Sequence, residues 1–283
     1  MFVIKVLLLS QLRDNNRTLF NTYKIFVICA IMQQKNKQET TVEPLENSED
    51  FETRFLPGLA IDTVIFGFHE NQLKILLLQY QNTGLFALPG GFIKKEENLN
   101  DAAKRVLQER TGLQNIYLEQ FYIFGDVSRH NRGAMEKIMV GKGLLPTEEH
   151  WLLRRFITVG YYALVDYTKA VPIPDLLSDG CDWYELSNLP ALMLDHKSIM
   201  EKALSTLREN LDAKLIGFNL MPETFTMGEL QSLYETILGL KLRRTSFQRK
   251  MLNLGILERV AKKMTGAAHK APYLYRFSLR EVI

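Results

Sequence analysis

The stretch GFIKKEENLNDAAKRVLQERTGL, at residues 91–113, decides the expected fold of this chain of 283 residues. Leu99, Ala103 and Leu107 recur at every fourth position and predict an amphipathic helix. Gly112 is expected to end the helix, because glycine readily adopts the left-handed conformation of a C-cap. A turn followed by a helix is common in proteins, so the spacing of the charged residues is more informative than the secondary structure.

Gly91, Glu97, Arg105, Glu109 and Gly112 stand at fixed offsets along this stretch and follow the motif LPGGF. This spacing resembles the box of the Nudix hydrolases, G-x5-E-x7-R-E-U-x-E-E-x-G-U, in which U is an aliphatic residue. The resemblance implies an α+β fold, a Nudix-like α/β/α sandwich with a mixed sheet. In the hydrolases of that family it also implies metal-dependent cleavage of a diphosphate.

Val106 and Arg110 depart from the box, because the family pattern has Glu at both positions. Residues four apart lie on one face of a helix, so two carboxylates there would point at one cation. Mg²⁺ needs oxygen ligands, whereas valine offers none and a guanidinium brings a positive charge. Glu109 remains, but it is also placed to pair with Arg105. We therefore expect a degenerate box with no catalytic residue, no metal ligand and no cofactor, unless residual hydrolysis uses Mg²⁺.

The composition, with 46% hydrophobic and 24% charged residues and a formal net charge of +3, is that of an ordinary soluble globular protein. Cys29 and Cys181 are the only two cysteines. They exclude a disulfide framework and a cysteine zinc site built from this chain alone. Such cysteine usage suits the reducing cytoplasm, and we expect a cytoplasmic protein with no membrane partner.

The N-terminal part of the chain shows no sign of a folded domain. The apolar runs within residues 1–31 are shorter than the roughly 20 residues that span a bilayer, and a polar stretch separates them. We expect that translation starts at Met32 or that this segment is a disordered arm. Residues 33–50 lack an apolar period and are expected to be a flexible lead-in. Residues 1–50 are thus interpreted as an extension.

Residues 51–214 are expected to form the Nudix-like domain, because apolar runs separated by short turns predict several strands. These runs occupy residues 60–68, 73–80, 85–88, 116–127, 156–166 and 181–190. The tetrapeptide HENQ predicts a hairpin turn between the first two strands, and Asp195 is a plausible N-cap for a helix that reaches Leu211. Residues 134–155 are longer than a hairpin connection. They are either a surface excursion with a helical turn after Pro146 or a lid or partner surface that carries Trp151.

Residues 215–283 are expected to form a second domain. Thr226 and Glu229 match a capping box at the start of a helix that ends at Gly239. A second helix at about residues 246–254 and two strands, at about 256–260 and in YLYRF, complete the order of a winged helix-turn-helix. The inward side chains of the second helix are expected to be Phe247, Met251 and Leu252.

The positive charge of the chain is concentrated in this second domain. Residues 241–270 contain nine Lys and Arg against one acid, Glu258, and nine minus one leaves a local charge of +8. A basic surface on a recognition helix and wing is the electrostatic footprint of binding to the DNA backbone. The expected DNA contacts are Arg243, Arg244, Thr245, Ser246, Gln248, Arg249, Lys250, Lys262, Lys263 and Lys270. A solvated charged helix with a basic tail is the plainer alternative.

The degenerate box followed by FNLMPETFTMGELQSLYETILGLKLRRTSFQRKML resembles the Nudix-related transcriptional regulators over about residues 55–280. In DAAKRVLQERTGL and IGFNLMPETFT it is similar to their arabinose-responsive type. The resemblance implies a homodimeric repressor or activator that binds operator DNA. It also implies that the Nudix domain senses a small-molecule effector, which is a sugar or an ADP-ribose-like metabolite, and that the regulated genes serve carbohydrate or NAD metabolism.

A pocket for such an effector needs cations near anionic groups and aromatic or polar walls. Arg110 is a candidate partner for a phosphate or hydroxyl group in place of the metal. The other candidates for effector binding are Phe124, Asp126, Arg129, Arg132 and Tyr161. The alternative functions are a Nudix hydrolase that acts on ADP-ribose or a nucleoside diphosphate sugar, and a non-enzymatic adaptor that contacts RNA or protein.

Overall fold

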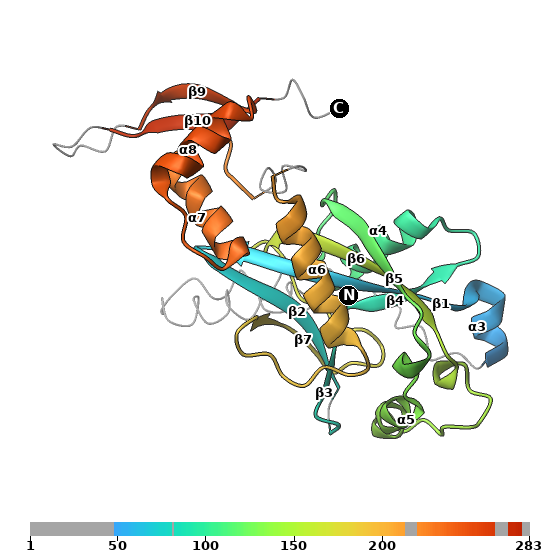
Figure 1. Ribbon diagram of the computed structural model, residues 1–283. Coiled ribbons are helices and arrows are strands. Elements are labelled where there is room, and N and C mark those ends of the chain that lie inside the picture. Colours follow the sequence, from blue (N-terminus) through green and yellow to red (C-terminus); the bar gives the residue numbers. More distant parts are fainter. Residues whose placement is uncertain (1–47, 81, 213–219, 264–270, 279–283) are drawn as a thin grey trace, which may run out of the picture. The chain divides into compact units, whose positions relative to one another are not determined.

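The computed structural model describes residues 48–80, 82–212, 220–263 and 271–278 (Figure 1). The expected start at Met32, the expected domain boundary near residue 214 and the candidate Lys270 lie outside these residues. No helix within the described ranges is long and apolar enough to cross a membrane.

A mixed sheet forms the centre of the first domain, as predicted. β1 lies in its middle, parallel to β6 and antiparallel to β2 and β4. The strand order is β3-β2-β1-β6-β5, with β4 beside β1 and β7 beside β2. The strands are β1 (Phe55–His69), β2 (Gln72–Tyr80), β3 (Leu85–Ala87), β4 (Gly90–Lys94), β5 (Leu118–Phe124), β6 (Ile157–Asp166) and β7 (Gly180–Glu185).

The hairpin between β1 and β2 turns where the HENQ motif predicts it. His69 pairs with Gln72, and the two residues between them, Glu70 and Asn71, have φ values of 45° and 63°. Positive φ at both central residues is the geometry of the tight turns that match the twist of antiparallel strands. The turn prediction is therefore confirmed.

Two helices cover the sheet, α4 (Leu99–Thr111) and α6 (His196–Asn210). Successive residues of a strand point to opposite faces, so the neighbours Tyr161 and Tyr162 of β6 enter different clusters. Tyr161 packs with Ala102 and Ala103 of α4, and Tyr162 belongs to the cluster that includes Ile199 and Ala203 of α6. The expected Nudix-like α/β/α sandwich is confirmed.

The Pro89-Gly90-Gly91 sequence leads directly into β4, a strand that is not among the expected apolar runs. Gly90 and Gly91 pair with Asp62 and Ile61 of β1. A Cβ atom on Gly90 would lie 2.8 Å from the Ile61 carbonyl oxygen, so the close approach of the two backbones requires glycine. The end of the expected lead-in also differs from the prediction, because residues 48–50 begin the helix α3 (Ser48–Arg54).

The long segment before β6 folds against the domain instead of standing off it. It contains the helix α5 (Arg132–Gly141) and the 3-10 turn η2 (Trp151–Leu153), and another such turn, η1 (Val127–Arg129), precedes it. Trp151 is buried and stacks on Phe51 with their ring centroids 3.8 Å apart. Trp151 is therefore not exposed to a partner in this structure, the lid stays a prediction, and the helical turn expected after Pro146 is present as η2.

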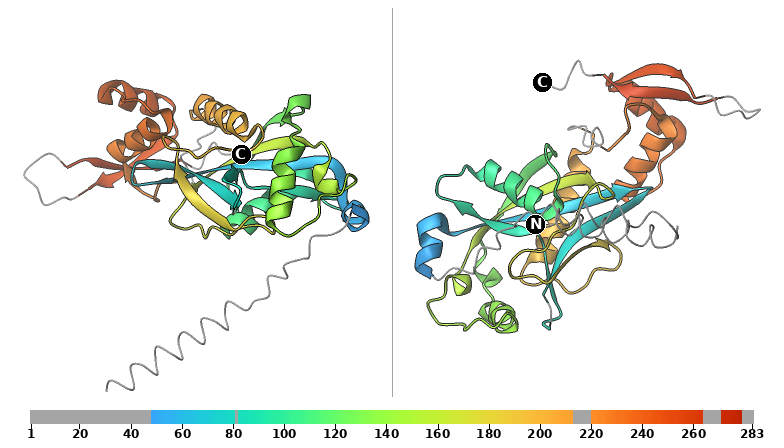
Figure 2. Two further views of the ribbon diagram at one scale, coloured as in Figure 1. Left: turned by 90° about the horizontal axis from the view of Figure 1, so that it is seen from below. Right: turned by 180° about the vertical axis from the view of Figure 1, so that it is seen from behind.

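The C-terminal module, coloured orange to red in Figure 2, has the order of a winged helix. Its elements are β8 (Phe225–Thr226), α7 (Met227–Leu238), α8 (Arg244–Asn253), β9 (Leu257–Lys262) and β10 (Tyr273–Phe277). The capping box is confirmed. The Glu229 amide donates to the Thr226 hydroxyl at 3.2 Å, and the Glu229 carboxylate accepts from the Thr226 amide at 2.6 Å.

The helix α8 begins at Arg244, about two residues before the expected start. Phe247 and Met251 are buried, as predicted, because they lie four residues apart on one face. Leu252 is 40% exposed, so its assignment to the inner face is wrong. It is the next residue after Met251, and one residue along a helix turns the side chain by about 100°.

Candidate functional site: a closed box, a cationic pocket and a basic helix

The box helix packs so tightly on β4 that Val106 occupies the space between them. Val106 is fully buried, and a Cβ atom on Gly91 would lie 2.6 Å from its Cγ2 atom. The family pattern has a glutamate at position 106, whose carboxylate would point at the cation. Val106 places only methyl groups in the space between α4 and β4. Glycine at position 91 is thus required by the contact of helix and strand.

Arg105 holds the loop between β4 and α4 in place. Its Nε and Nη2 atoms donate to the two carboxylate oxygens of Glu97, each at 2.8 Å, and Nη2 also donates to the Phe92 carbonyl at 2.8 Å. The expected pair with Glu109 is present at 3.2 Å, but Glu97 is the principal partner. The hydrogen bonds from Arg105 lower the pKa of the Glu97 carboxyl below its usual value. Both residues act here as structural supports.

Arg110, the candidate substitute for the metal, is turned toward its own chain. Its Nη1 atom donates to the Ile173 carbonyl at 3.3 Å, and Nη2 lies 3.5 Å from the Glu109 carboxylate. The amides of Val171 and Ile173 donate to the carbonyls of Thr111 and Arg110. This loop therefore lies along the end of α4. The Arg110 Nε atom is buried with no hydrogen-bond partner among the described residues.

The donor set of the box does not fit Mg²⁺. Val106 has no donor atom, and the Arg110 guanidinium would repel a cation. Within the described ranges, no group of three or more His, Cys, Asp or Glu side chains is placed to hold a metal ion. Glu97, one of the carboxylates that the box retains, is already held by Arg105.

A buried charge network lies where η1 meets the start of α6. The Arg129 side chain is only 6% exposed. Its Nε atom donates to Asp195 at 3.0 Å, its Nη1 atom donates to the Phe156 carbonyl at 2.7 Å, and Nη2 lies 3.4 Å from Asp62. Asp195 precedes α6 as expected, but its side chain makes no capping hydrogen bond and serves the arginine instead.

His196 extends this network to the box turn. Its Nδ1 atom accepts a hydrogen bond from the Leu88 amide at 2.9 Å, and Nε2 lies 3.9 Å from Asp62. Burial lowers the pKa of His196, so the neutral imidazole is favoured. The turn before β4, the strand β1 and the start of α6 are thereby joined through polar side chains.

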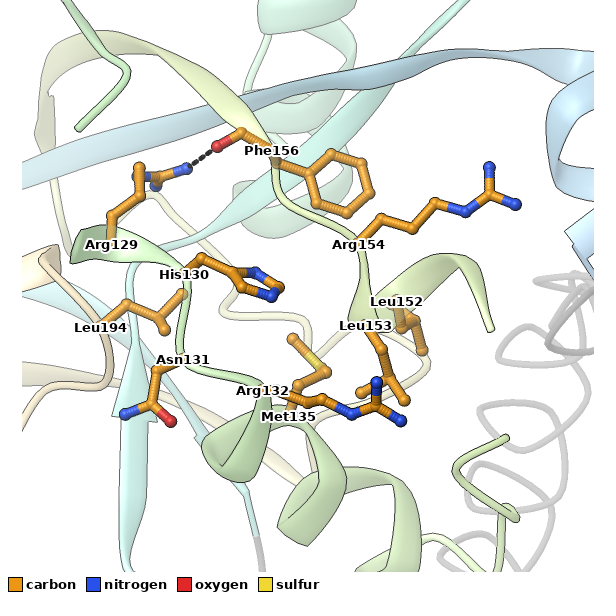
Figure 3. A pocket seen from close by; sticks show the side chains of 10 residues that line it. All are labelled: Arg129, His130, Asn131, Arg132, Met135, Leu152, Leu153, Arg154, Phe156 and Leu194. Carbon is orange, nitrogen blue, oxygen red and sulfur yellow. Dashed lines mark hydrogen bonds between the residues drawn. The ribbon is translucent and has the colours of Figure 1, made fainter. Parts of the chain in front are cut away.

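A small pocket opens beside Arg129 (Figure 3). Its volume is about 60 Å³. The lining residues are Arg129, His130, Asn131, Arg132, Met135, Leu152, Leu153, Arg154, Phe156 and Leu194. Arg132 pairs with Glu136 at 2.7 Å and Arg154 pairs with Glu52, but neither acid lines the pocket. The exposed wall of the pocket is mainly apolar, although several of its residues carry basic side chains.

Of the effector-binding candidates, only Arg129 and Arg132 line this pocket. Tyr161 is buried on the α4 side, where its hydroxyl donates to Asn100 at 2.7 Å. Phe124 packs edge-on against Phe121 of β5. Asp126 is exposed and caps η1 by accepting hydrogen bonds from the amide and hydroxyl of the residue two positions on. These three residues have structural contacts elsewhere.

Sequence reasoning missed His130 and Arg154 as lining residues. His130 stands in the motif SRHNRG beside two arginines that were singled out. Arg154 lies near the end of residues 134–155, a segment for which the sequence analysis considered only Trp151 as a functional residue. The adjacent Arg154-Arg155 pair was the available signal, but nothing local to the sequence shows that only Arg154 faces the pocket.

The first turn of α8 presents an exposed basic surface. Arg243, Arg244, Thr245, Ser246 and Arg249 are all exposed, whereas Gln248 is half-buried. The three arginines make no salt bridge with any residue of the described ranges. Unpaired guanidinium groups at the start of such a helix are suited to phosphate oxygens and to the edge of guanine.

Other lysines that were expected to contact DNA already have partners. Lys250 pairs with Asp212, and Lys263 pairs with Glu229 at 2.9 Å. Lys262 lies over the Tyr273 ring with its Nζ atom 5.7 Å from the centroid. Lys250 therefore has an acidic partner at the end of the first domain, and its contact with DNA stays a prediction.

Two further hydrogen bonds join the end of α6 to α7. The Arg208 Nε atom donates to the Ile237 carbonyl at 2.9 Å, and the Tyr234 hydroxyl donates to the Leu211 carbonyl at 3.3 Å. The helix that begins beside Arg129 thus ends against the C-terminal module.

Two domain families match the chain. The NUDIX domain matches residues 56–206, and the NrtR DNA-binding winged helix domain matches residues 217–277. Together they cover the box, the pocket and the basic helix.

Individual relatives match most of the chain or about half of it. The ADPR responsive transcriptional repressor NtrR of Acinetobacter baylyi is 32% identical over 232 residues, which are 80% of this chain and 84% of the relative. The structure of Shewanella oneidensis NrtR complexed with a 27mer DNA is 29% identical, with a TM-score of 0.57, and the match covers 78% of this chain and 93% of that one. The ADP-ribose pyrophosphatase of Methanocaldococcus jannaschii is 28% identical over 148 residues, 51% of this chain and 72% of the relative.

Proposed function

Because the chain belongs to the Nudix-related transcriptional regulators with an NrtR-type winged helix domain, we propose that it is a repressor whose operator binding is controlled by a small-molecule effector. The observation that carries the proposal is the set of exposed arginines at α8 that make no salt bridge with a described residue, in a chain whose box has Val106 and Arg110 at the metal positions. The first feature suits a DNA backbone, and the second leaves the Nudix domain free to bind a ligand without cleaving it.

The effector we propose is ADP-ribose or a related sugar metabolite, and the regulated genes serve NAD or carbohydrate metabolism. The similarity to an ADPR responsive repressor supports the first of these. The active form in the proposal is a homodimer, since two copies would read two half-sites of an operator. We place the protein in the cytoplasm, beside the chromosome.

The proposal is tested by fluorescence anisotropy with DNA from upstream of the protein's own gene. Binding is expected to weaken steeply with salt, because counterions are released from the DNA. ADP-ribose is expected to change the affinity, since an effector acts by binding the DNA-bound and free forms unequally. An unchanged affinity in the presence of ADP-ribose and of pentoses would contradict the effector part.

The competing function is a Nudix hydrolase, which the retained Glu97 and Glu109 and the similarity to a pyrophosphatase favour. It predicts Mg²⁺-dependent breakdown of ADP-ribose that Glu109→Gln abolishes. Rapid breakdown by a protein that ignores its upstream DNA at low salt would reject the repressor. Binding to RNA or protein instead of the operator would favour the adaptor.

A further inference from the structure

We infer that Gln231 and Glu235 of α7 are positioning residues for DNA binding. Their side chains hold the backbone of Leu242, and this backbone sets the direction in which α8 leaves the turn between the two helices. The role rests on the proposed function, because its main readout is the preference of the protein for operator DNA.

Both polar backbone groups of Leu242 are bound by side chains of the preceding helix. The Leu242 amide donates to the Glu235 carboxylate at 3.0 Å, and the Leu242 carbonyl accepts from the Gln231 Nε2 atom at 2.9 Å. The same Nε2 atom donates to the Glu235 carboxylate at 2.8 Å. Gln231 and Glu235 lie four residues apart and therefore on one face of α7. The two side chains form a turn clamp on the residue that precedes Arg243, the N-cap of α8.

The turn clamp acts where α7 and α8 are joined (Figure 1). α7 ends at Gly239, whose φ is 71°, and the next two residues are exposed. Arg243 makes no side-chain capping hydrogen bond, and the first buried side chain of α8 is that of Phe247. The hydrogen bonds at Leu242 thus hold the start of α8, and the packing of Phe247 holds the helix about one turn later.

A loosened start of α8 would affect the reading of bases more than the general attraction to DNA. Arg244 and Arg249 are exposed on this helix and make no salt bridge with a described residue. Contacts with phosphates position a protein on any duplex, whereas bidentate hydrogen bonds to base edges need a defined geometry. Loss of the turn clamp is therefore expected to reduce the preference for the operator over other sequences.

The charge of Glu235 by itself would oppose DNA binding, because the phosphates are anionic. Hydrogen bonds from Lys241, from the Leu242 amide and from Gln231 lower the pKa of Glu235 to about 2, so the carboxylate is ionised at neutral pH. Lys241 is 92% exposed, and an exposed ion pair of this kind contributes little. Removal of the carboxylate should therefore strengthen DNA binding if charge dominates and weaken it if the bond to Leu242 dominates.

Fluorescence anisotropy on the full chain tests the role with two duplexes of equal length, the DNA upstream of the protein's own gene and a scrambled version of it. Glu235→Ala is expected to lower the ratio of the two affinities by about tenfold, as the loss of a charge-assisted hydrogen bond implies. Gln231→Ala should also lower this ratio. Glu235→Gln should lower it less, since the glutamine oxygen still accepts from the Leu242 amide. Lys241→Ala is the matched control, because it removes the ion pair and leaves both bonds to Leu242.

Three outcomes in folded variants would overturn the positioning role. These are a ratio that Glu235→Ala leaves unchanged or raises, an equal loss of affinity for both duplexes, and the same fall of the ratio in Lys241→Ala. Circular dichroism at the assay temperature checks the folding of each variant. If Glu235→Ala does not fold, the ratio measured for Gln231→Ala decides.

Operator binding and the turn clamp fail separately. A parent protein that binds both duplexes equally contradicts the proposed function. If the parent prefers the upstream duplex and Glu235→Ala keeps this preference, the regulator stands and the positioning role is wrong. Hydrogen exchange without DNA tests the clamp itself, since the Leu242 amide should exchange faster in Glu235→Ala than in Lys241→Ala. Equal exchange rates in these two variants would contradict the hydrogen bond to Leu242.

Discussion

The arginines of α4 and those of α8 bear the same group in opposite surroundings. Arg105 is half-buried and gives its hydrogen bonds to Glu97 and a backbone carbonyl. Arg244 and Arg249 are exposed and have no salt bridge with a described residue. The difference shows that the supply of partners within the chain, and not the residue type, separates a structural arginine from one available to a ligand.

The largest effect on stability is expected at Arg129, an arginine that is buried, unlike those of α4 and α8. Arg129→Met leaves Asp62 and Asp195 without their cation and should lower the free energy of unfolding by about 3–5 kcal/mol. Urea denaturation measures this loss. Arg132→Met removes an exposed pair and serves as the control, with a change of about 1 kcal/mol or less. Similar losses of unfolding free energy in Arg129→Met and Arg132→Met would contradict the idea that the buried arginine contributes more to stability than the exposed one.

On α8, Arg249→Ala should reduce the affinity for operator DNA by about 1–3 kcal/mol while leaving the unfolding free energy nearly unchanged. The reason is that this side chain is exposed and supports no packing. Anisotropy at several salt concentrations should also show a shallower salt slope, since one phosphate or base contact is lost. Lys241→Ala is the control, because Lys241 pairs with Glu235 at 2.8 Å. An unaffected Arg249→Ala would refute the assignment of α8 as the recognition helix.

In the box, Gly91→Ala should cost about 1–3 kcal/mol of stability through overpacking against Val106, whose Cγ2 would lie 2.6 Å from the new Cβ. Combining it with Val106→Ala makes room for the methyl group. The double variant should therefore lose less than the sum of the two single losses, as measured by a thermodynamic cycle in urea. Additive losses would mean that helix and strand do not meet at these two residues.

The smallest effect is expected from Glu97, whose folded-state pKa lies below its ordinary value of 4.5 because Arg105 donates to the carboxylate. A lowered folded pKa contributes stability that is complete above the unfolded pKa and is lost as the pH falls through the folded pKa. Glu97→Gln should reduce stability at pH 7 by about 1 kcal/mol, and the loss should be smaller at pH 3. An equal loss at both pH values would assign the effect to packing instead of charge.

Local signals in the sequence were sufficient for much of the fold. The box helix, the HENQ turn and the capping box of Thr226 and Glu229 each depend on residues a few positions apart. Such local contacts can be predicted directly from the periodicity of apolar residues and from capping residues. The same reasoning assigned Leu252 to the wrong face of α8, because apolar character alone does not distinguish neighbouring faces near a helix end.

The candidate site was harder to predict because its contacts join distant parts of the sequence. Arg129 and Asp195 are 66 residues apart, and Lys250 and Asp212 are 38 apart. A count of charges cannot show that Asp212, which comes from the first domain, is a partner of Lys250. The strand β4 was missed for a similar reason, because its glycines were interpreted without the β1 backbone that they accompany.

The contact of Gly91 with Val106 also bears on how this chain could change over evolutionary time. A glutamate regained at position 106 would have to enter a fully buried space that now holds an isopropyl group. Single substitutions toward a metal site would thus be selected against as folding defects before any catalytic advantage arose. Because α4 packs closely on β4 at this point, a change from glutamate to valine at position 106 is easier to accommodate than the reverse change.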